Sequence, residues 1–473
     1  MTDLSQLDLS RLQFATTTIY HFIFVPLTIG LAFLVAILHT RWYRSGDPQL
    51  RRLARFFGTI LLINIAIGVV TGLVQEFQFG MNWSQYSRFV GDVFGAPLAM
   101  EGLAAFFLES TFLGLWLFGW NILPKRVHLA CIWAVAIGTA LSAAFIMAAN
   151  SWMQNPVGYE INAETGRAQL TDVVALFTNP VFVWGYAHVL LASLVTGCMV
   201  MLSVSAWHLR KRSSPELFIR TAKMSLIVLL PTSIVILGVG SQLGVIENEY
   251  QPMKVAAMEA QWDNCGPCSF SVFQIGGGQN DENPTQIWEI PHLLSILATG
   301  TWDGPVTGLN ELQEQYEEKY GPGYYIPNVF IQYWSMRTMA YLGSVLPIFV
   351  LWGLFAWRRK KLATSRVFLW VATWAVVTPF IMNTAGWLLT ENGRQPWIVQ
   401  GLQLTADANS PSVSRAEVAI SLTTFALLYI VLGIVWLFLM LRYSRRGLEF
   451  EHDDSTDPED PDGSARRAPV LTY

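Results

Sequence analysis

Nine apolar segments, each long enough to cross a lipid bilayer as a helix, constrain this chain more than any other feature. A helical span needs about 20 residues. The segments lie near residues 15–40, 54–79, 94–121, 126–150, 179–208, 218–245, 331–357, 366–390 and 415–442. Only 14% of the 473 residues are charged, whereas a soluble domain carries about 25%. The sequence therefore predicts an all-α integral membrane protein with about nine transmembrane helices.

The connections between these segments alternate in charge. Arg and Lys mark residues 41–55, 124–126, 210–223, 358–366 and the stretch from Arg442 onward. The other connections are neutral or acidic and cover residues 80–94, 151–178, 247–330 and 391–416. Because Lys and Arg gather on the cytoplasmic side of a membrane, all nine segments fit one orientation. We expect the N-terminus outside the membrane and the C-terminus in the cytoplasm.

This topology divides the chain into four parts. Residues 1–246 are predicted to form transmembrane helices 1–6, and residues 331–448 helices 7–9. Residues 247–330 form a long extracytoplasmic loop, and loops of this length are often functional. Residues 449–473 are acidic and predict a disordered cytoplasmic tail. In the long loop, Cys265 and Cys268 could form a disulfide or remain two thiols.

Two glutamates interrupt the third apolar segment, in GAPLAMEGLAAFFLEST at residues 95–111. A carboxyl group in the hydrocarbon core costs about 2.5 kcal/mol or more, so Glu101 and Glu109 are candidate functional residues. Eight residues of helix separate them by about 12 Å. They would form two steps of a ladder that runs from one membrane surface towards the middle. The plainer alternative is that both cap or pair with neighbouring helices.

Candidate metal ligands gather in one outer layer of the predicted bundle. Counted from the outer helix ends, His21, His188, Met339 and Glu391 lie at similar depths, as does Glu101. A histidine with a methionine thioether makes a low-spin heme site that leaves no position open for oxygen. A single buried histidine, however, is more often a hydrogen-bonded structural residue than a ligand.

Two arginines lie on the same predicted side of the membrane. Arg337 falls inside the seventh segment, where a permanently charged guanidinium must face a carboxylate or a heme propionate. Arg394 lies in ENGRQPW at residues 391–397, where it suggests an anionic ligand such as a propionate. The alternative interpretation of that stretch is a helix end, with Gly393 stopping the helix and Pro396 preventing its continuation.

Long motifs along nearly the whole chain resemble subunit I of cytochrome bd-type quinol oxidases. They are QEFQFGMNW (75–83), GDVFGAPLAMEGLAAFFLEST (91–111), NSWMQNPVG (150–158), the loop stretch 254–259 and GWLLTENGRQPW (386–397). The resemblance implies a heme-containing terminal oxidase that oxidises quinol at the extracytoplasmic loop and reduces O₂ to water. Protons would come from the cytoplasm, so a proton motive force would arise without pumping.

The resemblance also implies a role for each candidate residue. His188 and Met339 would be the axial ligands of low-spin heme b558, and Glu391 the ligand of high-spin heme b595. His21 would bind the iron of heme d with Glu101 close by, and the order of these two ligands stays open.

Further roles follow from the same resemblance. Arg337 would stabilise the reduced low-spin heme, and Trp387 would lie between hemes. Glu109 would relay protons, while Lys254 and Glu259 would belong to the quinol-binding loop. Arg394 remains a candidate for a propionate.

The implied setting is a multi-pass protein of a bacterial plasma membrane. Its partners would be subunit II, small accessory subunits, O₂, membrane lipid and either ubiquinol or menaquinol, with no role for nucleic acid. Two other functions would use similar residues: a proton- or ion-coupled transporter, and a b-type electron-transfer subunit without oxygen chemistry. A transporter would be expected to show paired interrupted helices in two related halves, and no such repeat is visible in the sequence.

Overall fold

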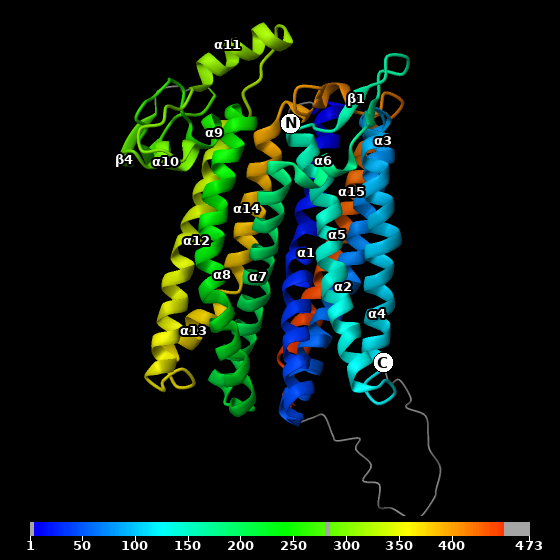
Figure 1. Cartoon of the computed structure of the whole chain (residues 1–473), viewed down its shortest axis with the longest axis vertical. Coiled ribbons are helices and arrows are strands. Elements are labelled where there is room, and N and C mark those ends of the chain that lie inside the picture. Colours follow the sequence, from blue (N-terminus) through cyan, green and yellow to red (C-terminus); the bar gives the residue numbers. More distant parts are fainter. Residues whose placement is uncertain (1–3, 280–283, 449–473) are drawn as a thin grey trace, which may run out of the picture.

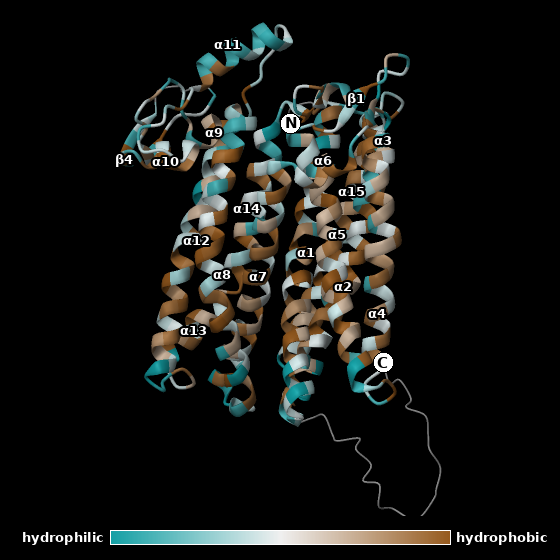
Figure 2. Cartoon of the chain, in the orientation of Figure 1, coloured by the Kyte–Doolittle hydropathy of each residue, from teal (hydrophilic) through white to brown (hydrophobic). Residues whose placement is uncertain are grey.

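The protein folds as an elongated bundle of near-parallel helices with a smaller lobe at one end (Figure 1). The computed structural model describes residues 4–279 and 284–448. Within these residues, nine helical spans are long and apolar enough to cross a membrane, which confirms the predicted number. Their middles are hydrophobic and their ends hydrophilic (Figure 2). The lobe lies at the same end of the bundle as the N-terminus. The orientation of that end in a membrane stays a prediction.

Seven of the nine spans are single continuous helices. These are α1 (Gln6–Ser45), α2 (Pro48–Met81), α5 (Lys125–Gln154), α7 (Pro180–Lys211), α8 (Pro215–Tyr250), α12 (Val329–Arg358) and α15 (Arg415–Ser444). The remaining two spans are interrupted. One combines α3 (Ser84–Met100), a π-helix η1 (Glu101–Phe106) and α4 (Phe107–Phe118). The other combines α13 (Arg366–Trp374) and α14 (Val377–Arg394).

Short elements cover the end of the bundle that carries the lobe. Three antiparallel two-stranded sheets pair β1 (Tyr159–Ile161) with β2 (Ala168–Leu170), β3 (Phe270–Ile275) with β4 (Thr285–Ile290), and β5 (Trp397–Val399) with β6 (Gln403–Leu404). The short helices are α6 (Val173–Thr178), α9 (Pro252–Glu259), α10 (Leu293–Thr299), α11 (Leu309–Tyr320) and the 3-10 turn η2 (Thr405–Asp407). The long loop therefore holds α9–α11, β3 and β4. In it, Cys265 and Cys268 form a disulfide.

Local sequence signals explain where the helices begin and end. Ser5 and Ser414 each form a capping box with the acidic residue three positions later, which satisfies free N–H groups of the first turn. Asp47 caps α2 by accepting a hydrogen bond from Gln49, and Pro48 follows as the first helical residue. Gly46 ends α1 with φ of 69°, a left-handed conformation that glycine adopts without strain.

The helices pack most closely where small residues meet. A Cβ atom on Gly30 of α1 would lie 2.0 Å from the Ser193 carbonyl oxygen of α7, and one on Gly197 would lie 2.5 Å from the Gly30 backbone. No larger side chain fits between these two backbones. Small residues that permit such approach are a common basis of helix association in membranes, where the hydrophobic effect does not hold helices together.

One predicted connection is wrong. Residues 80–94 were expected to be a loop, but only Asn82 and Trp83 separate α2 from α3. Glycines and polar residues in this stretch lower its hydropathy below that of a membrane span. Its helical form is stabilised instead by tertiary packing, since Tyr86, Val90 and Phe94 are buried in a cluster with Trp152 of α5. The tail at residues 449–473, predicted to be disordered, lies outside the described residues.

Candidate functional site

A cavity of about 600 Å³ lies between α1, α5, α7, α8, α12 and α14 and reaches the long loop. His188 of α7 and Met339 of α12 both line it. The two predicted axial ligands therefore reach one cavity from separate helices. Glu247, Glu259 and Trp387 line the same cavity, so the candidate ligands and the candidate quinol-loop residues border a common space.

The residues around His188 and Met339 fit a heme. The Nδ1 atom of His188 is buried and has no hydrogen-bond partner, which is costly for a polar atom unless a bound group satisfies it. Two glycines border the ligands: a Cβ on Gly240 would lie 3.3 Å from the His188 ring, and one on Gly386 would lie 3.0 Å from the Met339 sulfur. The glycines thus let the His188 ring lie close against α8 and the Met339 sulfur close against α14.

Arg337 binds a carboxylate, the first of the two partners predicted for it. Its guanidinium donates to Glu259 at 2.7 Å, to the Met258 carbonyl oxygen at 2.5 Å and to the Ser271 carbonyl oxygen at 2.7 Å. It also stacks over the Tyr333 ring at 3.7 Å. Arg337 is only 1% exposed. Through both terminal nitrogens this arginine fastens α12 to α9 and β3, and therefore anchors the long loop to the bundle.

Lys254 belongs to a second buried ion pair on α9. Its Nζ atom donates to Gln154 at 2.7 Å and to Glu247 at 3.1 Å. Burial lowers the pKa of Lys254, while the charge of Glu247 opposes that shift. For Glu259, burial raises the pKa against the opposing charge of Arg337. The end of α14 packs tightly here, because a Cβ on Gly393 would lie 2.5 Å from the Lys254 side chain.

Glu391 and Arg394 form an ion pair in the last turn of α14. The other carboxylate oxygen of Glu391 accepts a hydrogen bond from Asn150 at 2.8 Å. Each oxygen keeps a further lone pair, so an iron ligand role remains chemically open. Arg394 is 3% exposed, and its Nε and one terminal nitrogen have no partner. These buried donors fit a propionate. The helix ends at Arg394, two residues before Pro396, which agrees with the predicted helix end; the propionate stays a prediction.

His21 lies on α1 against α2, where its tautomer is determined by its neighbours. The Nδ1 atom of His21 is 2.9 Å from the Thr71 hydroxyl oxygen, and that hydroxyl donates to the Gly68 carbonyl oxygen at 2.9 Å. A hydroxyl has one proton to donate, so when Thr71 gives it to Gly68 its oxygen accepts from Nδ1–H of His21. The Nε2 atom then carries the free lone pair that a metal ligand needs. Gly72 lets the ring approach α2 closely, since a Cβ there would lie 3.1 Å from it.

Trp387 connects the surroundings of His21 to the cavity. Its ring stacks on Phe22 with centroids 5.0 Å apart and an interplanar angle of 11°. Phe22 follows His21 in the chain, and both Phe22 and Trp387 line the cavity. The Trp387 Nε1 atom is buried without a partner. Trp387 therefore contacts the residue next to His21 and lines the cavity of His188 and Met339, while its place between hemes stays a prediction.

Glu101 lies at the first residue of the π-helix and accepts a hydrogen bond from Ser142 of α5 at 2.7 Å. A π-helical turn inside an α-helix frequently marks a functional position. Glu109 of α4 and Glu76 of α2 both lie close enough to Glu101 for their charges to interact. Among the described residues no hydrogen bond or ion pair joins Glu101 to His21, so the structure leaves the order of these two predicted ligands open.

Sequence reasoning missed four residues of this arrangement: Thr71, Glu76, Gln154 and Glu247. Glu76 carried a signal, because it is an acidic residue near the end of an apolar segment and within a motif used for the family resemblance. Glu247 was assigned to the long loop as its first residue, although it belongs to α8. Thr71 and Gln154 carry no charge, and only the contacts they make reveal their roles.

The fold and these contacts define a class of protein, a multi-pass membrane subunit with a heme-sized cavity beside a loop held by buried ion pairs. The family model described as cytochrome bd terminal oxidase subunit I matches residues 9–448. The chain belongs to this family. It is therefore an oxidoreductase subunit of the respiratory chain in a bacterial membrane.

Individual proteins agree with that assignment. The chain is 44% identical over 464 residues to cytochrome bd ubiquinol oxidase subunit 1 of Bacillus subtilis (strain 168), covering 96% of this chain and 98% of the relative. It is 37% identical to cytochrome bd-II ubiquinol oxidase subunit 1 of Escherichia coli (strain K12), covering 93% and 96%. It also matches the bd oxidase structure from Geobacillus thermodenitrificans with a TM-score of 0.85 and 31% identity, covering 94% of this chain and all of that one.

Proposed function

We propose that this subunit oxidises quinol beside the long loop and reduces O₂ to water with the electrons released. Two quinols supply the four electrons for one O₂, and each gives up two protons. The observation that best supports this function is the shared cavity, which is lined by His188 and Met339 and also by Glu247 and Glu259 of the two ion pairs. Family membership decides against the transporter and against an electron-transfer subunit without oxygen chemistry.

The donor set suits three hemes. His188 with Met339 would hold heme b558, Glu391 would hold heme b595, and His21 with Glu101 nearby would hold heme d. When bound, these hemes supply one-electron transfer and oxygen binding. Arg394 would bind a propionate through its unpartnered nitrogens, and Trp387 would separate two of the groups.

The long loop would bind the quinol. Lys254 and Glu259 lie on one short helix, and each belongs to a buried ion pair, with Glu247 and with Arg337 respectively. Glu247 and Glu259 face the cavity and are candidate acceptors for the hydroxyl protons. These protons would leave on the loop side, which we expect to be extracytoplasmic.

Protons for oxygen reduction would arrive from the opposite side. Glu109 lies eight residues deeper than Glu101 along the same span, on the way to the basic end of the bundle. It would hold and pass protons to Glu101. Releasing protons on one side and consuming them from the other generates a membrane potential, so no pumping element is needed.

Oxygen uptake and redox-difference spectra of the purified complex test this function. A quinol should drive oxygen consumption, and His188→Ala and Met339→Ala should each remove the low-spin b-type band. Met201→Ala is a matched control, because Met201 is buried in the core away from the cavity. A complex without heme bands, or a low-spin band that survives both ligand substitutions, would overturn the proposal.

A further inference from the structure

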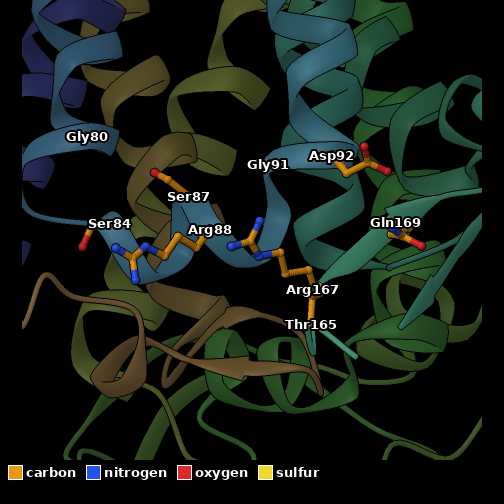
Figure 3. A pocket seen from close by; sticks show the side chains of 9 residues that line it. All are labelled: Gly80, Ser84, Ser87, Arg88, Gly91, Asp92, Thr165, Arg167 and Gln169. Atoms are coloured by element: carbon orange, nitrogen blue, oxygen red, sulfur yellow. The ribbon is translucent and has the colours of Figure 1, made fainter. Parts of the chain in front are cut away.

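A second pocket, of about 610 Å³, is lined by residues of α2, α3 and the β1–β2 hairpin, and α3 and β1 lie across the bundle from the lobe that holds α10 and α11 (Figure 1). Figure 3 shows its lining, which comes from the end of α2, the first turns of α3, the turn between β1 and β2, and β2 itself. Arg88 of α3 and Arg167 of that turn both contribute. None of the residues discussed for quinol or oxygen chemistry lines this pocket.

The two arginines have unused binding capacity. Both side chains are exposed, and within residues 4–279 and 284–448 neither forms an ion pair with a carboxylate. Arginine presents several N–H donors in a planar arrangement that matches the oxygens of a phosphate. Two such groups from separate elements at one pocket therefore favour an anionic ligand.

The rest of the lining suits a phosphate ester. Ser84 is the first residue of α3, where the helix dipole favours negative charge. The hydroxyls of Ser84 and Thr165 line the pocket and make no hydrogen bond within the described part of the chain. Gly91 leaves the pocket open, since a Cβ there would meet nothing within 4 Å. Asp92 is the one acidic residue in the lining, and one of its oxygens accepts from Leu170 N at 3.0 Å.

An apolar stripe leads from the pocket along an exposed side of α2. Val70, Leu73 and Phe77 are 40%, 55% and 67% exposed. Gly80, which lines the pocket, follows Phe77 at the same helical spacing. All four residues therefore lie on one face of the helix. This stripe distinguishes between two sources of phosphate. A free anion would use only the arginines, whereas a phospholipid would also lay an acyl chain along the stripe.

We propose that Arg88 and Arg167 bind the phosphodiester of a membrane phospholipid, whose acyl chain packs on Val70, Leu73 and Phe77. The site lies in the leaflet on the side of the long loop. Asp92 lies at the edge of the same pocket, where it would face a cationic headgroup such as an ethanolamine. The inference is independent of the proposed function, since it uses none of the same residues.

Native mass spectrometry of the purified complex tests the site during stepwise removal of lipid by detergent. The wild-type complex should retain phospholipid after the detergent has removed the loosely bound lipid. The double variant Arg88→Gln with Arg167→Gln should retain about thirtyfold less, as expected for two lost charges near a membrane surface. Arg11→Gln is the matched control, because Arg11 is an exposed arginine in the first turns of α1. Unchanged heme spectra would verify that the variants fold.

A second pair of variants separates lipid from free anion. Leu73→Ala with Phe77→Ala should also weaken lipid retention, and added inorganic phosphate should not replace the lipid. The proposal is wrong if the double arginine variant keeps its lipid. It is equally wrong if inorganic phosphate displaces the bound lipid while the stripe variant retains it, or if cysteines placed at Leu73 and Phe77 cross-link to another subunit that covers the stripe.

Discussion

The Nδ1 atom of His21 lies 2.9 Å from the Thr71 hydroxyl oxygen, and that hydroxyl donates its own proton to the Gly68 carbonyl oxygen. This chain of donors and acceptors suits the tautomer of His21 with its proton on Nδ1, which leaves Nε2 free. Hydrogen bonds of this kind orient metal-ligating histidines and make them stronger donors. An uncharged threonine on a neighbouring helix thereby controls the predicted oxygen-site ligand.

Thr71→Val should weaken the His21 site, since valine has nearly the same shape but accepts no hydrogen bond. We expect lower occupancy of the predicted heme d or a shifted d-type band, with activity reduced by about tenfold or more. Thr71→Ser keeps the hydroxyl and should preserve the spectrum. Heme content and redox-difference spectra measure both effects. A valine variant with a wild-type spectrum and activity would show that Thr71 does not position His21.

Arg337→Gln should disrupt the attachment of the long loop. It leaves Glu259 buried without its counter-ion, and breaking such a pair costs about 3–5 kcal/mol. We expect a lower unfolding temperature and slower quinol oxidation. If Arg337 also acts on the low-spin heme, the midpoint potential of that heme should fall, because a positive charge favours the reduced state. Arg358→Gln, at the exposed opposite end of α12, is the control for loss of an arginine from the same helix.

Glu247→Gln should destabilise the protein in a pH-dependent way. Burial already lowers the pKa of Lys254, and Glu247 opposes that shift, so removing Glu247 lowers it further. Below this pKa the folded protein must keep an unpaired buried charge; above it Lys254 is neutral. The unfolded chain binds the proton more tightly, so stability should rise with pH. The loss in unfolding temperature relative to wild type should therefore be larger at about pH 6 than at about pH 9.5. An equal loss at both values would contradict this account.

Lys254→Met and Glu259→Gln should impair quinol oxidation more than oxygen reduction. Both residues lie on α9, outside the spans that carry the predicted oxygen ligands. Oxygen uptake with a quinol donor should fall, while uptake with an artificial donor that bypasses the loop should stay close to wild type. Equal loss with both donors would argue that these residues only stabilise the fold.

Glu109→Gln should slow oxygen reduction while heme content stays intact, because the amide no longer carries a proton. Glu216→Gln is a suitable control, since Glu216 is an exposed acid in the first turn of α8. Loss of hemes from the Glu109 variant would instead indicate a structural role. The neighbouring Glu76→Gln should resemble Glu109→Gln if the three interacting carboxyls form one relay.

The number of spans and most candidate residues could be predicted from the sequence because their signals are local. A bilayer requires about 20 apolar residues per helix, and an ionisable side chain such as Glu101, Glu109 or Arg337 is conspicuous against that background. The motifs around Glu391 and Glu101 also indicated the family to which the chain belongs. Hydropathy predicted a loop at residues 80–94, whereas most of this stretch is helical. Packing of Tyr86 and Phe94 against α5 stabilises the helix despite its polar composition.

Only the tertiary structure decided which residues act together. Arg337 meets Glu259, Lys254 meets Glu247, and His21 meets Thr71, and none of these pairs is spaced as a recognisable motif. The physical reason is that a membrane helix is specified mainly by its own hydropathy, whereas its neighbours depend on close contacts such as Gly30 against Gly197. The sequence by itself determined the spans, the family and the unusual charges; the packing of those spans decided the partner of each charge.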